Sequence, residues 1–236
     1  MSIAENVAAV RANMAAAARA AGRDPAEIRL VAATKMNDAE RVREAIAAGV
    51  DICGENRVQE MLEKQRQGAY EGAPLHFIGH LQKNKVKQVV GLAALIHGAD
   101  SRELLEVISR TAAARGLVQD VLLEVNVGGE ASKSGFREEE IPAVLEFASA
   151  LPALRVRGLM AIPPICDFPE ENRPFFCRMQ KLFVDNGEKK YDNVSMDFLS
   201  MGMSGDYTEA IACGANLVRV GTAIFGARNY QKPNFL

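Results

Sequence analysis

The chain has 236 residues, a length at which a single domain can bury a sizeable hydrophobic core. Its 28 lysines and arginines nearly balance its 30 aspartates and glutamates, so the net charge of −2 gives no signature of a nucleic-acid-binding protein. The four cysteines lie far apart and form no C-x-x-C pair, a pattern that fits the reducing cytoplasm better than a disulfide framework.

An alanine-rich segment opens the chain. Ile3, Val7, Val10 and Met14 recur in it at spacings of four and three, which predicts an amphipathic helix packed on a core. Charged residues interrupt the segment, so it lacks the continuous apolar region of a signal peptide. No apolar stretch of the sequence is long enough to span a bilayer, and we expect a cytoplasmic protein without membrane contact.

Eight short apolar runs alternate with helix-like segments along the rest of the chain. The helical patterns include residues 38–46, 101–115 and 137–150, and Ser101 is a typical N-cap. The runs that we predict as strands are residues 28–34, 50–53, 75–80, 92–98, 118–127, 156–162, 196–201 and 216–220.

This alternation predicts an α/β fold with a parallel sheet, and the count of eight favours closure into one (β/α)₈ TIM-type barrel over residues 1–236. A doubly wound open sheet is the alternative. Such a sheet usually has a glycine-rich turn after its first strand, and residues 34–37 contain no glycine.

Lys35 follows the first predicted strand directly. The carboxyl ends of barrel strands are where active-site groups gather, and a partly desolvated lysine there loses its proton more easily. Such an amine is a nucleophile for carbonyl compounds, so the position suggests Schiff-base chemistry. The alternative is a lysine whose amine simply reaches solvent from the end of a strand.

Two glycine-containing loops follow the last two predicted strands. Residues 200–206 supply hydroxyls and glycines, and residues 221–226 begin with Gly221 and Thr222. Barrels of this kind commonly bind a phosphate group at these two loops, so together they predict a phosphate site. Taken singly, each loop could equally be an ordinary turn.

Three further patterns suggest other chemistries. Residues 128–135 superficially resemble a P-loop, but Ser132 stands where that motif needs a glycine, and we expect this loop to cover the barrel mouth. His76 and His80 share the parity of one strand and could form half of a metal site, yet no third ligand has a diagnostic spacing. The basic run 82–87 lacks aromatic residues and is typical of a solvated helix face.

Several segments, in this order along the chain, resemble the YggS-like pyridoxal phosphate homeostasis proteins. The resemblance implies a single alanine-racemase-type barrel, which is fold type III among the proteins that use pyridoxal 5′-phosphate (PLP). It implies that a lysine binds PLP covalently. It also implies a protein that carries or buffers PLP without established catalytic turnover. Met36-Asn37-Asp38 departs from the turn that relatives often have. The matching segments are residues 34–35, 54–60, 76–85, 133–136, 157–162, 199–204 and 218–226.

The resemblance also implies roles for individual residues. Lys35 would form the Schiff base, and Asn56 would lie beside the ring or its substituents. Arg219 would face the pyridine nitrogen, where an arginine can only donate hydrogen bonds and so favours the unprotonated ring. The residues expected at the phosphate are Ser204, Gly221 and Thr222, with Ser200 and Met203 lining the same loop.

A PLP-dependent amino-acid racemase is the main alternative. A racemase needs two acid/base groups on opposite faces of the cofactor, and in the racemases that the chain resembles the second is a tyrosine aided by an extra domain. We expect no such domain in this chain, and none of its four tyrosines lies in a suitable motif. A barrel that binds another phosphorylated metabolite without covalent chemistry is a third possibility. We expect a monomer whose partners are PLP and apo PLP-dependent enzymes.

Overall fold

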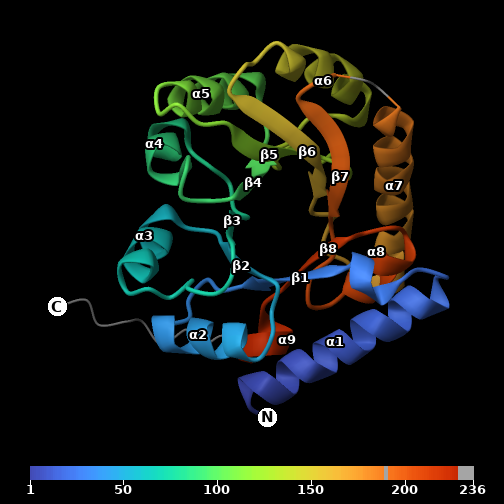
Figure 1. Cartoon of the computed structure of the whole chain (residues 1–236). Coiled ribbons are helices and arrows are strands. Elements are labelled where there is room, and N and C mark those ends of the chain that lie inside the picture. Colours follow the sequence, from blue (N-terminus) through green and yellow to red (C-terminus); the bar gives the residue numbers. More distant parts are fainter. Residues whose placement is uncertain (189–190, 228–236) are drawn as a thin grey trace.

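Eight parallel strands form a closed barrel in the order of the chain, and the helices surround it (Figure 1). The computed structural model describes residues 1–188 and 191–227. The predicted (β/α)₈ barrel is therefore confirmed. The strands are β1 (Arg29–Ala33), β2 (Ile52–Glu55), β3 (Leu75–Phe77), β4 (Leu95–Ala99), β5 (Gln119–Val125), β6 (Leu154–Ala161), β7 (Val194–Ser200) and β8 (Leu217–Val220).

Helices connect successive strands on the outside of the barrel (Figure 1). Ser101 caps one of them as predicted, because its hydroxyl accepts the amide of Leu104 at 3.4 Å. The described helices are α1 (Ile3–Ala20), α2 (Ala39–Ala47), α3 (Val58–Arg66), α4 (Val86–Val89), α5 (Arg102–Ala113), α6 (Ile141–Ser149), α7 (Arg173–Gly187), α8 (Tyr207–Ala212) and α9 (Thr222–Phe225).

The amino-terminal helix α1 packs against α8 and α9 at the side where the barrel closes (Figure 1). Its buried face is the predicted stripe, and its first turn has a capping box. The Ser2 hydroxyl accepts the Glu5 amide at 3.2 Å, and the Glu5 carboxylate accepts the Ser2 amide at 2.7 Å.

Side chains alternate along each strand between the helical layer and the barrel interior. The interior holds an apolar cluster that is separate from the larger core between the strands and the helices. Polar side chains on β3, β4, β7 and β8 share this inward direction. The apolar members of the interior cluster are Val31, Ile52, Ile78, Leu95, Leu122, Met160 and Leu217.

Some boundaries differ from the predicted ones. The strand predicted over residues 75–80 ends at Phe77. At Gly79 the chain approaches the end of β2 so closely that a Cβ would lie 2.4 Å from the carbonyl oxygen of Asn56. The helix predicted over 137–150 begins with a 3₁₀ turn at Glu138–Glu140 before α6. Within the described ranges, no helix combines the length and the apolar character needed to cross a membrane.

Candidate functional site

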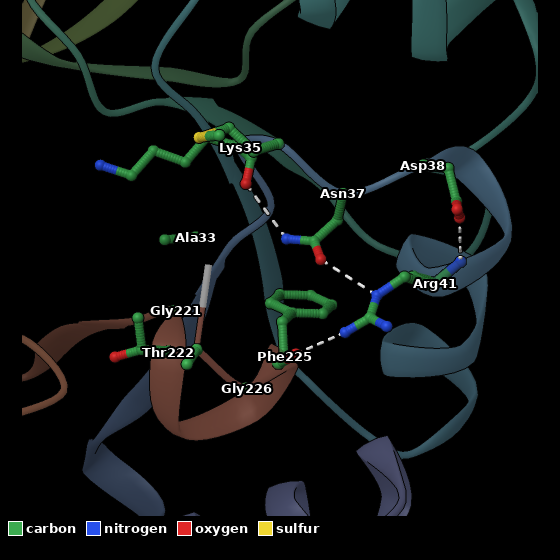
Figure 2. A pocket seen from close by; sticks show the side chains of 11 residues that line it. Ala33, Lys35, Asn37, Asp38, Arg41, Gly221, Thr222, Phe225 and Gly226 are labelled. Atoms are coloured by element: carbon green, nitrogen blue, oxygen red, sulfur yellow. Dashed lines mark hydrogen bonds between the residues drawn. The ribbon is translucent and has the colours of Figure 1, made fainter. Parts of the chain in front are cut away.

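Lys35 lies two residues beyond the end of β1, at the carboxyl-terminal mouth of the barrel. It has the parity of Val31 and Ala33, whose side chains belong to the barrel interior, and it is half-buried. A cavity of about 220 Å³ is lined by Lys35 together with Gly221 and Thr222, as Figure 2 shows. The fold thus brings the end of β1 and the segment that follows β8 to one site.

The backbone at Lys35 is held by polar side chains of α3. Lys64 donates its ammonium group to the carbonyl oxygen of Thr34 at 2.8 Å, and the amide of Met36 donates to the carboxylate of Glu60 at 2.8 Å. Met36 has a positive φ of 61°, which is uncommon outside glycine. These contacts on both sides of Lys35 fix the direction in which its side chain leaves the strand.

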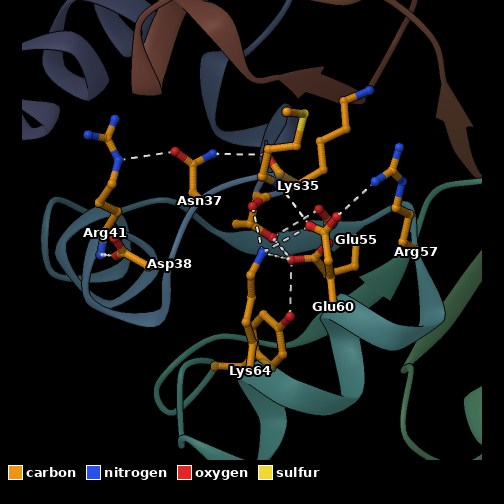
Figure 3. Close-up of polar contacts among 12 residues, drawn as sticks. Lys35, Asn37, Asp38, Arg41, Glu55, Arg57, Glu60 and Lys64 are labelled. Atoms are coloured by element: carbon orange, nitrogen blue, oxygen red, sulfur yellow. Dashed lines mark hydrogen bonds and ion pairs between the residues drawn. The ribbon is translucent and has the colours of Figure 1, made fainter. Parts of the chain in front are cut away.

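A buried charge cluster supports this arrangement from the outer side of the barrel. The carboxylate of Glu55 is fully buried, and its Oε1 accepts Thr34 Oγ1 at 2.6 Å and the hydroxyl of Tyr70 at 3.1 Å. Lys64 Nζ lies 2.6 Å from the same oxygen. Burial and the Glu55 carboxylate raise the pKa of Tyr70. Lys35 extends away from this cluster (Figure 3).

A second set of contacts builds the wall of the cavity beside Lys35. Asn37 donates its side-chain amide to the carbonyl oxygen of Lys35 at 3.1 Å and accepts Arg41 Nε at 3.0 Å. Arg41 also donates to the carbonyl oxygen of Phe225 at 2.5 Å (Figure 2). The loop after β1 is therefore linked to α9, the helix that follows the last strand.

The two loops predicted to hold a phosphate group lie side by side and are connected by two hydrogen bonds. The hydroxyl of Ser204 accepts the backbone amides of Gly221 at 3.0 Å and of Ala223 at 3.4 Å. Thr222 is exposed at the cavity. Met203 is 38 % exposed and lines neither this cavity nor the second one at the mouth.

Arg219 projects from β8 into the barrel beneath these loops, and 5 % of its surface is exposed. Its Nη1 donates to the hydroxyl of Ser200 at 2.5 Å, and its Nη2 donates to the carbonyl oxygen of Ala161 at 2.9 Å. Burial lowers the pKa of Arg219 to about 10, although Glu124 and Asp206 oppose this shift. The guanidinium therefore stays protonated at neutral pH.

Asn56 lies just beyond the end of β2 and lines a second cavity of about 240 Å³ at the mouth. Among the described residues, its buried Oδ1 has no hydrogen-bond partner. Glu124 of β5 lines the same cavity, and burial together with the nearby Asp100 raises its pKa. The unsatisfied Oδ1 of Asn56 is a polar atom in this part of the mouth that a ligand can bind.

The structure also places the loop and the histidines that the sequence analysis singled out. Lys133 and Ser134 line the second cavity, as the prediction of a loop over the mouth requires. The two histidines, for which a metal site was considered and not favoured, have different partners. His76 is buried beside His97, whereas His80 is exposed and pairs with Asp100 at 2.9 Å. No group of three metal-binding side chains occurs in the part of the chain that the structure describes.

Sequence reasoning missed Glu55, Lys64, His97 and Glu124 as parts of the site. Strand parity could have found the last two, because each lies two residues beyond an apolar residue of the barrel interior. No local pattern marks the contact of Lys64 with Glu55, since it joins a helix to a strand across the layer between them.

A family model described as the N-terminal domain of alanine racemase matches residues 6–229. The fold and this match define the class of the molecule, a barrel of the alanine racemase N-terminal type. The "Pyridoxal phosphate homeostasis protein" of Pseudomonas aeruginosa is 44 % identical over 98 % of each chain. The protein of the same name from Aquifex aeolicus is 41 % identical over 98 % of this chain and its own full length.

Among solved structures, PipY of Synechococcus elongatus with PLP bound is 32 % identical and has a TM-score of 0.81. The match covers 95 % of this chain and all of PipY. The chain belongs to the family of the pyridoxal phosphate homeostasis proteins. The curated relatives have the name of a homeostasis protein and not that of an enzyme.

Proposed function

We propose that this chain binds PLP, forms a Schiff base with it through Lys35 and takes part in PLP homeostasis as a carrier or buffer. The observation behind the proposal is the cavity that Lys35 shares with Gly221 and Thr222. It combines a primary amine with the loop that is suited to a phosphate group, and PLP has an aldehyde and a phosphate on one small ring. The bound PLP of PipY supports the same ligand class.

Side chains at the barrel mouth, in this cavity and beside it, fit such a ligand. The hydroxyls of Ser204 and Thr222 offer donors for a phosphate beside Gly221, whose amide is bonded to Ser204, and the Oδ1 of Asn56 lacks a partner among the described residues. The described hydrogen bonds use two of the five N–H donors of Arg219, which leaves others for a ring nitrogen. Ser200 acts through Arg219, and Met203 shapes the loop that includes Ser204.

The donor set also bears on whether the protein turns over a substrate. PLP, when bound, supplies an aldehyde for condensation with amines and a ring that accepts electrons when its nitrogen is protonated. The guanidinium of Arg219 can donate a hydrogen bond to the ring nitrogen but cannot accept one from it. It therefore favours the unprotonated ring, which is a poor electron acceptor. A site of this kind holds a reactive cofactor without promoting its carbanion chemistry.

A racemase is the weaker alternative because an acid/base group opposite Lys35 is not found among the described tyrosines. Tyr70 donates its hydroxyl to buried Glu55, and neither Tyr191 nor Tyr207 lines the two cavities at the barrel mouth. Tyr230 lies outside the described residues. Two positioned groups are required for racemisation, so we propose no amino-acid turnover.

The acceptors of PLP, the cellular location and the oligomeric state of the protein also belong to the proposal. We propose apo PLP-dependent enzymes as acceptors of the cofactor, because an amine of an acceptor can displace Lys35 from PLP at an open barrel mouth. A cytoplasmic location is supported by the four unpaired cysteines. The predicted monomeric state stays a prediction that sedimentation measurements can test.

The experiment for this proposal compares binding, transfer and catalysis in one preparation. Purified protein should bind PLP with a visible absorbance band and restore activity to an apo PLP-dependent enzyme. It should not racemise or transaminate amino acids at a rate in the ordinary enzyme range of about 1–10³ s⁻¹. Catalysis in that range would contradict the carrier function, and absence of PLP binding would contradict the whole proposal.

A further inference from the structure

A continuous line of polar side chains crosses the otherwise apolar barrel interior. His76 Nδ1 lies 2.9 Å from His97 Nε2, and His97 Nδ1 lies 3.0 Å from the hydroxyl oxygen of Ser200. Ser200 in turn accepts Arg219 Nη1 at 2.5 Å. All four side chains are at most 7 % exposed, and they come from β3, β4, β7 and β8.

The direction of the hydrogen bonds in this line follows from the donors. Arginine only donates, so Ser200 accepts from Arg219. If His97 also donated to Ser200, the buried hydroxyl proton would have no acceptor among the described residues. The hydroxyl therefore donates to His97 Nδ1, and His97 must have its own proton on Nε2. That proton is donated to His76 Nδ1, and His76 then has its proton on Nε2.

Burial, aided by nearby positive charge, favours the neutral form of both imidazoles. Burial and the nearby Arg29 lower the pKa of His76 to about 4, with Asp120 opposing the shift. Burial, His76 and Arg219 lower the pKa of His97 well below its usual value. Arg29 and Asp120 lie at the beginnings of their strands, so the line runs from the amino-terminal end of the barrel towards its mouth. At the mouth, the charges that act on Arg219 are Glu124 and Asp206.

We propose that His97 and His76 are positioning residues for Arg219: through Ser200 they hold the guanidinium in the one orientation that leaves its free N–H groups facing the ring of a bound pyridine. The inference rests on the proposed PLP site. Without His97, the Ser200 hydroxyl lacks its acceptor and rotates to find another. Arg219 then loses a fixed partner beneath the site, and its contact with the ring nitrogen loosens.

The first test uses the ligand-free wild-type protein. The chain has three histidines, so ¹⁵N NMR can resolve the chemical shifts of their side-chain nitrogens. A His80→Gln variant helps to assign the signals to the individual rings. We expect His97 and His76 as neutral rings with the proton on Nε2, unchanged between pH 5 and pH 8. A proton on Nδ1 of His97, or a charged His97 in this range, would overturn the proposed direction.

The second test measures the consequence at the site with pyridoxine 5′-phosphate, which has the ring and the phosphate but no aldehyde for Lys35. We expect His97→Phe to weaken its binding about three- to tenfold and to raise the protonated fraction of the bound ring, read from its absorbance against pH. His97→Gln, which can accept from Ser200 and donate to His76, should restore both values. Leu95→Val on the same strand is the packing control and should change neither.

The outcomes separate this inference from the proposed function. If the wild type binds neither PLP nor pyridoxine 5′-phosphate, the proposed function fails, and the NMR result still tests the direction of the line. If the wild type binds both and folded His97→Phe has unchanged affinity and ring protonation, the positioning role is wrong. Equal losses in His97→Phe and Leu95→Val would also overturn it, because packing alone would then account for the effect.

Discussion

The backbone amide of Gly221 donates a hydrogen bond to the hydroxyl of Ser204 at 3.0 Å, and this bond joins the loops after β7 and β8. Ser204 comes from a loop whose turn depends on Gly202, where φ is 89° and a Cβ would lie 2.6 Å from that of Ala210. The two loops are therefore held together, as the proposed phosphate site requires.

Replacing Ser204 by alanine should weaken PLP binding by about 1.5–3 kcal/mol, because one hydrogen bond to a charged phosphate is lost. Pyridoxal, which lacks the phosphate, should bind the variant as it binds the wild type. Ser195→Ala is a matched control. The Ser195 hydroxyl donates to Asp197 near the start of β7, the strand that precedes the loop of Ser204. Titrations of both ligands measure the effect. Equal losses for PLP and pyridoxal would show that Ser204 does not contact the phosphate.

Replacing Lys64 by methionine should reduce the free energy of unfolding by about 3–5 kcal/mol, because the buried carboxylate of Glu55 loses its charged partner. Lys181→Met removes an exposed ion pair with Asp185 and should cost about 0.5 kcal/mol or less. Urea unfolding of the two variants gives the comparison. Similar values for both would mean that the Glu55 cluster does not stabilise the backbone at Lys35.

Acid should destabilise the protein in a window set by its buried histidines. The folded-state pKa of His76 is about 4, against about 6.5 unfolded, so the unfolded chain binds more protons between these values. Stability is then lost as the pH falls below about 6.5, by roughly 2 kcal/mol for His76 at pH 5. His97 acts in the same direction. The raised pKa of Glu124 acts in the opposite direction.

The comparison of His76→Gln with the wild type isolates this contribution, since Glu124 is common to both. We expect the variant to lose less stability than the wild type between pH 7 and pH 5, measured by urea unfolding. His80→Gln serves as the exposed control and should follow the wild type. A His76→Gln profile parallel to that of the wild type would contradict a neutral His76.

The left-handed backbone at Met36 should make this position sensitive to β-branched residues. Met36→Val should destabilise the protein by about 1–2 kcal/mol, because a branched Cβ is strained at positive φ. Met36→Asn should be tolerated, since asparagine adopts this conformation readily. Thermal unfolding of both variants is the measurement. Equal stability of the two would mean that another conformation is accessible at this position.

The fold was predictable because its signals are local and repeated. Each buried strand is a short apolar run, and each helix shows its own periodicity, so the alternation defined the barrel. The region of Lys35 and Gly221 was predictable for a related reason, since strand ends of a barrel meet at one mouth. The reach of Lys64 to Thr34 and the line through His97 were not, because they depend on contacts between elements far apart in the sequence.

Strand ends show the same limit. Leu75, Phe77 and Ile78 give the run predicted over residues 75–80 its apolar character, yet β3 ends at Phe77 because the chain closes on Asn56 at Gly79. Beyond this close contact, His80 lies exposed beside Asp100, whereas His76 is buried beside His97. The parity that His76 and His80 share over the predicted strand is therefore lost at a boundary that only the tertiary contact determines.

Reduction of the PLP-loaded protein with borohydride, followed by peptide mapping, tests the central claim most directly. The account predicts one pyridoxyl group per chain, attached to Lys35, and no such adduct in Lys35→Ala. Lys64→Arg is the control for the neighbouring amine and should keep the adduct on Lys35. A pyridoxyl group on another lysine of the wild type, or an undiminished adduct in Lys35→Ala, would contradict the account.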